Sequence, residues 1–268
     1  MKYCRFQYEN TSHYGLVESV AGKDAITHLV LSPPEEANGD VDSGPSKQIT
    51  PLALSDATLF EPVRPSKIIC VGRNYREHAA ELGNEVPKEP LLFFKPPSAL
   101  SAPGGTVRRL SFAERSDYEG ELGVVIGKRC SKLAPDEDVR PYILGYTCVN
   151  DFTARDLQKK DGQWARAKGF DTSCPVGPVV TSQLDPWAGV TVETRVNGQV
   201  RQHGTTLDLI FPIDAVIRYI ARVMTLLPGD LIATGTPSGV GPVFARDVME
   251  IEISGIGILR NPVADEVA

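Results

Sequence analysis

The stretch that decides the fold is DYEGELGVVI, residues 117–126. It runs from acidic residues into an apolar, β-branched segment that is typical of a buried strand. On a strand, Glu119 and Glu121 point to the same face with their Cα atoms about 6.5–7 Å apart. Two carboxylates so placed repel each other, and water, a cationic side chain or a metal ion must offset that repulsion. Taken alone, the pair also fits the solvated edge of an amphipathic strand.

A third acid follows a second apolar strand. The segment YILGYTCVN (142–150) leads directly into Asp151, and such strand exits often carry functional residues. Glu119, Glu121 and Asp151 are a hard, all-oxygen set with no Cys or His pair beside them. This set suits Mg²⁺, Mn²⁺ or Ca²⁺ better than Zn²⁺. We therefore expect one divalent cation at these three residues.

A short helix is expected in RNYREHAAELG (73–83), since Asn74 is a good N-cap and Gly83 a suitable stop. His78 and Glu81 lie on one face of this helix at i and i+3. A carboxylate beside an imidazole raises its basicity and fixes its tautomer, which the activation of a water molecule requires. The alternative is an ordinary His–Glu contact on a surface helix. The polar character of residues 75–90 favours a mobile lid.

Two charged segments and one glycine-rich loop complete the candidates. Arg155 and Gln158 in ARDLQ (154–158), with Lys168 further on, could hold an anionic substrate beside a metal; the alternative is a charged loop. The loop ATGTPSGVGP (233–242) lacks the Gly-Lys-Ser/Thr of a nucleotide-binding loop, and no helical pattern follows it. Its backbone N–H groups and the hydroxyls of Thr234 and Thr236 could still hold a carboxylate.

The rest of the chain predicts many short strands and few helices. Apolar runs of 4–8 residues, broken by Gly and Pro, recur from residue 68 to residue 253. Only residues 212–224 have the spacing of a longer helix. Residues 1–60 are expected to form a small β-rich unit with a loop or linker at 32–47, and residues 61–268 a larger second domain. The predicted class is mixed α/β, mainly β.

Composition excludes several classes of protein. With 28 basic and 34 acidic residues the net charge is −6, which argues against a nucleic-acid or membrane-surface partner. No apolar run approaches the roughly 20 residues of a membrane span, and the first residues carry no apolar signal segment. Five scattered cysteines with no C-x-x-C indicate buried, reduced thiols and a cytoplasmic location.

Seven segments, taken in order, resemble the fumarylacetoacetate hydrolase family over roughly residues 63–262. They read GRNYREHAAELG, FFKPPSAL, DYEGELGVVIGKR, GYTCVNDFTARDLQ, WARAKGFDTSCPVGP, VNGQVRQHGTT and PGDLIATGTPSGVGP. The resemblance implies a β-roll or β-sandwich core with the active site in a cleft over the sheet. It also suggests a homodimer. No upstream Asp of the larger hydrolase is identifiable, which places the chain nearer the smaller acylpyruvase and oxaloacetate decarboxylase members.

The resemblance also assigns roles to particular residues. It implies Mg²⁺ or Mn²⁺ held by Glu119, Glu121 and Asp151, with Ca²⁺ as a substitute in crystals. The water-activating pair is His78 and Glu81, and Lys168 stabilises developing negative charge. The positions that match substrate-contacting residues are Arg73, Arg155, Gln158 and Thr236.

This residue set predicts enolate chemistry on a small 2-oxo acid. A metal-bound 2-oxo acid loses a substituent or a proton at the next carbon, and the metal and Lys168 stabilise the enolate. The first expectation is hydrolysis of the C–C bond in acylpyruvate-type 2,4-dioxo acids, with water activated by His78. Oxaloacetate decarboxylation and keto–enol tautomerisation or isomerisation are alternatives on the same site. A non-catalytic binding protein is a further alternative, which the complete residue set disfavours.

Overall fold

The computed structural model describes residues 1–37, 46–81, 83 and 85–266. The predicted class is confirmed, because strands dominate and the helices are few and short. No helix within these ranges is long and apolar enough to cross a membrane.

The largest sheet has twelve strands. Ten follow the order β4-β3-β2-β1-β14-β12-β11-β17-β6-β7, while β5 pairs with β1 and β8 with β14. The bounds are β1 Lys2–Tyr8, β2 Thr11–Val20, β3 Lys23–Val30, β4 Ser46–Ala53, β5 Leu59–Phe60, β6 Ile68–Gly72, β7 Leu91–Lys95, β8 Leu100–Ser101, β11 Gly120–Ile126, β12 Ile143–Asn150, β14 Cys174–Thr181 and β17 Leu231–Ala233.

Two smaller sheets and four α-helices complete the described part of the chain. The five-stranded sheet runs β16-β15-β19-β20-β9 and the three-stranded sheet β13-β10-β18. Their bounds are β9 Val107–Arg109, β10 Ser116–Tyr118, β13 Thr153–Ala154, β15 Thr191–Val196, β16 Gln199–Thr205, β18 Gly241–Pro242, β19 Val248–Ile253 and β20 Gly257–Asp265. The α-helices are α1 Arg76–Glu81, α2 Arg155–Lys160, α3 Ala165–Lys168 and α4 Ile213–Val223.

The main core lies between the twelve-stranded and five-stranded sheets. Every residue of β11 is buried, whereas buried and half-buried residues alternate along β15 and β19. Continuous burial explains the unbroken apolar run that predicts β11, and alternation marks strands with one covered face. Leu122 and Val124 of β11 belong to the same apolar cluster as Val192 and Ile251 of the facing sheet.

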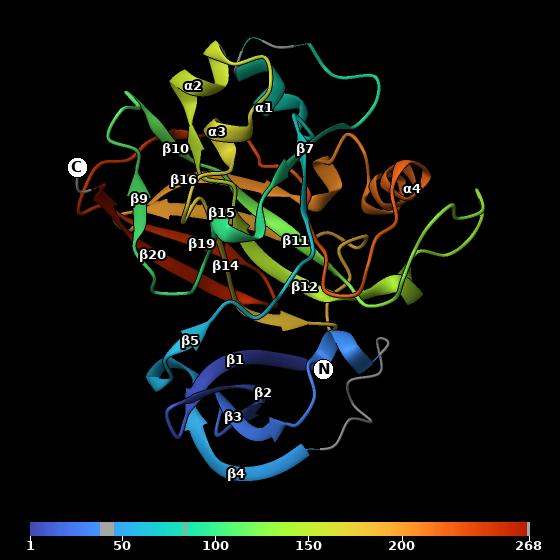
Figure 1. The fold of residues 1–268 in the computed structure, drawn as a ribbon, viewed down its shortest axis with the longest axis vertical. Coiled ribbons are helices and arrows are strands. Elements are labelled where there is room, and N and C mark those ends of the chain that lie inside the picture. Colours follow the sequence, from blue (N-terminus) through green and yellow to red (C-terminus); the bar gives the residue numbers. More distant parts are fainter. Residues whose placement is uncertain (38–45, 82, 84, 267–268) are drawn as a thin grey trace.

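The N-terminal strands extend the large sheet. β1 pairs with β14, with Lys2 opposite Thr181, so main-chain pairing continues from β1–β4 into the centre of the molecule. In Figure 1 these strands lie at the opposite end of the molecule from α1, α2 and α3. The division into residues 1–60 and 61–268 stays a prediction.

Most local predictions agree with the structure. The helix predicted at 212–224 is α4, and the turn between β15 and β16 has positive φ at both Asn197 and Gly198, as a tight hairpin requires. All five cysteines are buried and free. The predicted 32–47 loop is too long at its C-terminal end, because β4 already begins at Ser46; residues 38–45 lie outside the described residues.

Candidate active site

The ends of β11 and β12 bring two of the acidic residues together. The strands run antiparallel, with Gly120 opposite Asn150, so Glu119 just before β11 lies beside Asp151 just after β12. The Asp151 backbone N–H donates to the Glu119 carbonyl at 2.9 Å. Glu119 itself falls between β10 and β11, at the point where the chain passes from one sheet into another.

Two more strands deliver side chains to the same end of the sheet. β17 runs antiparallel to β11 and parallel to β6, so the loops that follow β17 and β6 leave the sheet side by side. The first carries Thr236 and the second Arg73. Arg73 adopts a left-handed φ of 57°, a conformation that costs a non-glycine residue about 1–2 kcal/mol. The next residue, Asn74, holds this turn through side-chain bonds to both backbone groups of Phe211 and to the Thr234 carbonyl.

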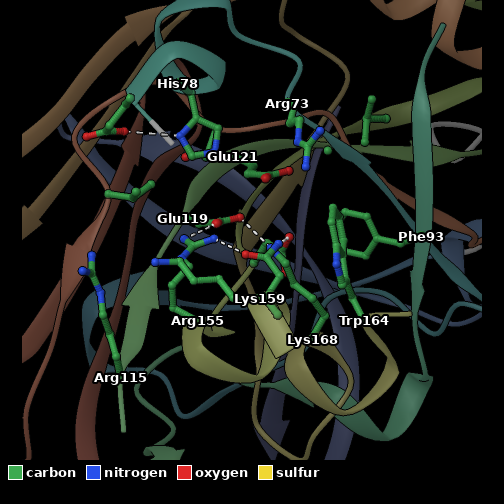
Figure 2. Close-up of a pocket in the computed structure, with 17 residues that line it drawn as sticks. Arg73, His78, Phe93, Arg115, Glu119, Glu121, Arg155, Lys159, Trp164 and Lys168 are labelled. Carbon is green, nitrogen blue, oxygen red and sulfur yellow. Dashed lines mark hydrogen bonds and ion pairs between the residues drawn. The ribbon is translucent and has the colours of Figure 1, made fainter. Parts of the chain in front are cut away.

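All ten predicted site residues line one cavity of about 530 Å³. They are Arg73, His78, Glu81, Glu119, Glu121, Asp151, Arg155, Gln158, Lys168 and Thr236. Figure 2 shows the labelled members converging from α1, from the strand ends and from the segment that carries α2 and α3. The structure therefore brings the predicted set together, while the role of each residue stays a prediction. Thr234 is outside this cavity, and its hydroxyl donates to the Leu122 carbonyl.

The three acidic residues form a compact, buried cluster. One carboxylate oxygen from each of Glu119, Glu121 and Asp151 lies within 4.8 Å of the others, and each residue is at most 4% exposed. Burial, and then the neighbouring carboxylates of Asp151 and Glu119, raise the pKa of Glu121 well above its usual range. A cation between these oxygens would remove that repulsion.

The donor set fits a hard divalent cation. Asp151 Oδ1 is buried and accepts no well-aligned hydrogen bond within the described ranges, although Lys95 Nζ lies 2.8 Å from it as an ion-pair partner. Three clustered carboxylates, with no thiolate or imidazole among them, match the preference of Mg²⁺ and Mn²⁺ for oxygen ligands.

Lys168 contacts two of the three clustered carboxylates. Its Nζ is 2.7 Å from Glu119 Oε2 and 2.6 Å from Asp151 Oδ2. Burial alone would lower the pKa of Lys168, but Asp151 and Glu119 outweigh it and raise that pKa above the usual value. Burial opposes ionisation of Glu119 too, yet Lys168 and Arg155 hold the pKa of Glu119 well below its usual range. The ammonium and this carboxylate therefore both stay charged at neutral pH.

Arg155 is held by protein partners on three sides. Its Nε donates to Asp117 Oδ2 at 2.8 Å, its Nη2 to Glu119 Oε1 at 2.5 Å and its Nη1 to Gln158 Oε1 at 2.5 Å. Asp117 is fully buried and also accepts two bonds from Arg115. The guanidinium of Arg155 thus orients Glu119, a contact that sequence reasoning did not predict.

The predicted His–Glu pair forms on α1. His78 Nδ1 lies 3.4 Å from Glu81 Oε2, and His78 is only 4% exposed, so this face of the helix is more buried than its polar sequence suggests. Burial is the main cause that lowers the pKa of His78, which keeps the ring neutral at pH 7. Glu81 also accepts the backbone N–H of Gly239, which ties α1 to the loop after β17.

Thr236 has its hydroxyl proton committed within the protein. Its Oγ1 donates to the Gly120 carbonyl at 2.8 Å and accepts from Gln202 Nε2 at 2.7 Å. Gln202 is fully buried, and its Oε1 accepts the Gly120 N–H while Nε2 also donates to the Pro237 carbonyl. These backbone groups fix the orientation of the amide, so Gln202 links the acidic strand to the Thr236 loop.

Sequence reasoning missed several residues of this site. Lys95, Arg115, Asp117 and Gln202 all lie at or just behind the cavity wall. Three of them stand inside quoted segments: Lys95 lies in FFKPPSAL, Asp117 opens DYEGELGVVI, and Gln202 lies in VNGQVRQHGTT. The only available signal was a charged or amide group next to apolar strand residues.

A mainly β architecture thus gathers buried carboxylates and cations at one end of a mixed sheet. The chain belongs to the fumarylacetoacetate hydrolase family: the family model described as fumarylacetoacetate (FAA) hydrolase C-terminal matches residues 67–264. The expected family is thereby confirmed.

Relatives and solved structures carry several activities. The chain is 45% identical over 225 residues to the oxaloacetate tautomerase YisK of Bacillus subtilis, covering 79% of this chain and 74% of that one. It is 38% identical to a 5-carboxymethyl-2-hydroxymuconate delta-isomerase from Mycobacterium smegmatis, with a TM-score of 0.86 and coverage of 99% and 100%. It is 36% identical to a fumarylpyruvate hydrolase from Pseudomonas aeruginosa in complex with Mn²⁺ and pyruvate, with a TM-score of 0.69 and coverage of 77% and 91%.

Proposed function

We propose that this chain is a Mg²⁺- or Mn²⁺-dependent enzyme that interconverts the keto and enol forms of a 2-oxo dicarboxylate such as oxaloacetate. The observation that carries the proposal is the cavity with three clustered carboxylates on its floor and cations on its walls. Support for this reaction comes from the 45% identical relative named oxaloacetate tautomerase and from the similar structure named an isomerase.

Charge balance favours a dianionic substrate. Six cationic side chains lie in or just behind the cavity wall, five of them lining it and Lys95 beside Asp151, against four lining carboxylates and the carboxylate of Asp117 behind them. These charges leave an excess of one positive charge, and a bound divalent cation raises that excess to three. A substrate with two carboxylates would neutralise two of these charges, whereas a monocarboxylate would neutralise only one. The lining cations are Arg73, Arg115, Arg155, Lys159 and Lys168.

Glu119, Glu121 and Asp151 would hold the divalent cation. When bound, it supplies Lewis-acid polarisation of the 2-oxo group and attracts negative charge onto the carbonyl oxygen. Lys168 stays protonated and adds a second positive charge over the same floor. Both charges favour the enolate over the neutral ketone, and Arg155 keeps Glu119 oriented.

His78 is the candidate base. A buried, neutral imidazole can accept a proton at pH 7, and Glu81 within 3.4 Å would stabilise the imidazolium that results. In the proposed reaction His78 takes a proton from the carbon next to the 2-oxo group, and the proton returns to the substrate oxygen or carbon. Burial of His78 and the cluster limits exchange of this proton with bulk water.

Hydrolysis of acylpyruvates is the second candidate function. The His78–Glu81 pair favours it, because the same neutral imidazole could instead deprotonate a water molecule that attacks the distal carbonyl. The similarity to a fumarylpyruvate hydrolase supports this reading too. Oxaloacetate decarboxylation needs the electron sink but no attacking water, and it remains a third outcome of the same assay.

One substrate panel tests these candidates together. Purified protein loaded with Mg²⁺ or Mn²⁺ is assayed for loss of the enol absorbance of oxaloacetate, for pyruvate release from acetylpyruvate, and for CO₂ release from oxaloacetate. We expect metal-dependent tautomerisation that EDTA abolishes. Tautomerisation that persists in EDTA would contradict the metal requirement, and acetylpyruvate cleavage without tautomerisation would replace the first function by the second.

The oligomeric state, the location and the partners of this enzyme are also proposals. We propose a homodimer that acts on a small 2-oxo acid in the cytoplasm, with neither nucleic acid nor membrane as a partner. The net charge of −6 supports the last two points, and sedimentation at several protein concentrations would test the dimer.

A further inference from the structure

Arg115 is a cation that the reaction outlined above leaves without a task. It lies just before β10, its side chain is 46% exposed, and it lines the cavity. Its Nε and Nη2 donate to the two oxygens of Asp117 at 2.7 and 3.1 Å. Its Nη1 has no protein partner within the described ranges, so this end of the guanidinium can still bind an anion.

Asp117 fixes the position of Arg115. The carboxylate is fully buried and is held from its other side by Arg155. A guanidinium held by two parallel bonds to a rigid carboxylate loses little further freedom when it binds a ligand. Asp117 therefore presents Arg115 to the cavity as a pre-organised group.

The other cations of the cavity are less suited to a distal contact. Arg155 is 2% exposed and already bonded to Asp117, Glu119 and Gln158, and Lys168 is bonded to the acidic floor. Lys159 is exposed, and no contact within the described ranges fixes its ammonium. Figure 2 shows Arg73 and Arg115 on opposite sides of Glu119 and Glu121. A molecule bound over the floor thus has one arginine beyond each end.

We propose that Arg115 binds the distal carboxylate of the substrate and so makes the enzyme select 2-oxo dicarboxylates over 2-oxo monocarboxylates. This inference rests on the proposed function and names its substrate class. The 2-oxo acid end lies over the acidic floor, and the far carboxylate accepts hydrogen bonds from the free edge of the Arg115 guanidinium. A purely structural Arg115, which only neutralises Asp117, is the competing explanation.

The chain offers a matched control for that explanation. Arg166 also donates two bonds to a single aspartate, Asp161, at 2.6 and 2.8 Å, and its side chain is 51% exposed. Arg166 does not line the cavity. R115M and R166M therefore remove the same charge and the same kind of ion pair, and they differ in access to the substrate.

The experiment measures dissociation constants on the Mg²⁺-loaded variants by competition with oxalate. Two ligand pairs compare a dicarboxylate with a monocarboxylate: oxaloacetate against 2-oxobutanoate, in which a methyl group replaces the distal carboxylate, and fumarylpyruvate against acetylpyruvate, which also lacks the vinylene group. For R115M we expect binding of the dicarboxylates to weaken about 10- to 100-fold, the range for a hydrogen bond to a charged group. The monocarboxylates and oxalate should bind as to the wild type, and R166M should leave all constants unchanged.

The outcomes separate the inference from the proposed function. Equal weakening of both members of each pair in R115M, or no weakening at all, would overturn the role of Arg115. R115K keeps the charge but not the planar fork, and it should recover only part of the selectivity. Unchanged oxalate binding shows that each variant is folded around its metal site. Because binding is measured rather than turnover, selective weakening would support the inference even if the wild type failed to tautomerise oxaloacetate.

Discussion

Gly120 stands between two of the acidic residues, and a methyl group there should disturb both. An added Cβ would overlap Thr194 Oγ1 and lie 3.3 Å from Ile251 Cγ2. Thr194 is fully buried on β15, in the facing sheet, so it has little room to move. Overpacking of this kind costs about 1–3 kcal/mol of unfolding free energy, and we expect G120A to lose that amount.

The strain should also reach the metal site. Glu119 and Glu121 flank Gly120, and Gln202 and Thr236 bind its N–H and carbonyl. A shift of this backbone moves two carboxylates and their support together. We expect Mn²⁺ affinity to fall by about 10- to 100-fold, as it does when outer-shell support of metal ligands is lost.

Thr194 provides the control. Its Oγ1 has no hydrogen-bond partner within the described ranges, so T194A removes an unsatisfied hydroxyl and one methyl and should change stability by less than about 1 kcal/mol. In the double variant the overlap is gone and Ile251 Cγ2 becomes the nearest neighbour. G120A/T194A should therefore regain most of the stability and Mn²⁺ affinity that G120A loses.

The wild type, G120A, T194A and G120A/T194A form a double-mutant cycle. Urea unfolding measures the stability of each protein, and calorimetric titration measures its Mn²⁺ affinity. A favourable coupling of at least about 1 kcal/mol between the two sites is expected. If the stability losses of G120A and T194A simply add in the double variant, the close contact with Thr194 is not the reason that position 120 requires glycine. Wild-type Mn²⁺ affinity in G120A would refute the connection between this strand and the metal site.

Four further predictions follow from the site. E121A should lower Mn²⁺ affinity at least about tenfold and abolish turnover; full Mg²⁺-dependent activity would remove Glu121 from the metal site. H78A should reduce acylpyruvate cleavage about 10²–10⁴-fold and spare oxaloacetate decarboxylation, assayed on one preparation; equal losses would assign His78 to a shared step. K95M should lower the free energy of unfolding, measured in urea with EDTA present, by about 3–5 kcal/mol, because it removes one ion-pair partner of the buried Asp151. A loss no larger than that of a variant at an exposed lysine would contradict this. Oxalate should increase hydrogen-exchange protection of residues 76–81, and unchanged protection would argue against a lid.

The sequence predicts the strands and the site residues well, for a physical reason. Strands buried on both faces, such as β11, must be apolar without interruption, and that run is visible without any tertiary information. Glu119, Asp151, Arg73 and Thr236 stand close to the ends of strands of the large sheet, so locating the strands helps to locate these side chains. His78, Glu81, Arg155, Gln158 and Lys168 lie on α1, α2 and α3, and the resemblance to the family, rather than the strand pattern, assigns them to the same site.

Long-range partners could not be predicted in the same way. Lys95 is fully buried because the carbonyls of Phe152, Lys168 and Ser173, 57 to 78 residues away, accept its ammonium hydrogens. Nothing near Lys95 in the chain signals this, and a lysine at a strand end is usually exposed. The burial of His78 was missed for a similar reason, since its cover comes from other parts of the chain.

The same contacts suggest why one residue set can serve several reactions. In the proposed reaction, enolate formation would depend on the acidic residues of the cavity floor, which Arg155 and Lys168 contact. The fate of the enolate would then depend on the group that reaches it next, and His78 on α1 is the candidate base. Glu81 fixes α1 by accepting the Gly239 N–H, and Glu77 adds a weaker bond from Ser238. Both contacts reach the loop that carries Thr236, so the position of His78 is coupled to the substrate wall. We therefore expect a displacement of this loop to displace His78 as well.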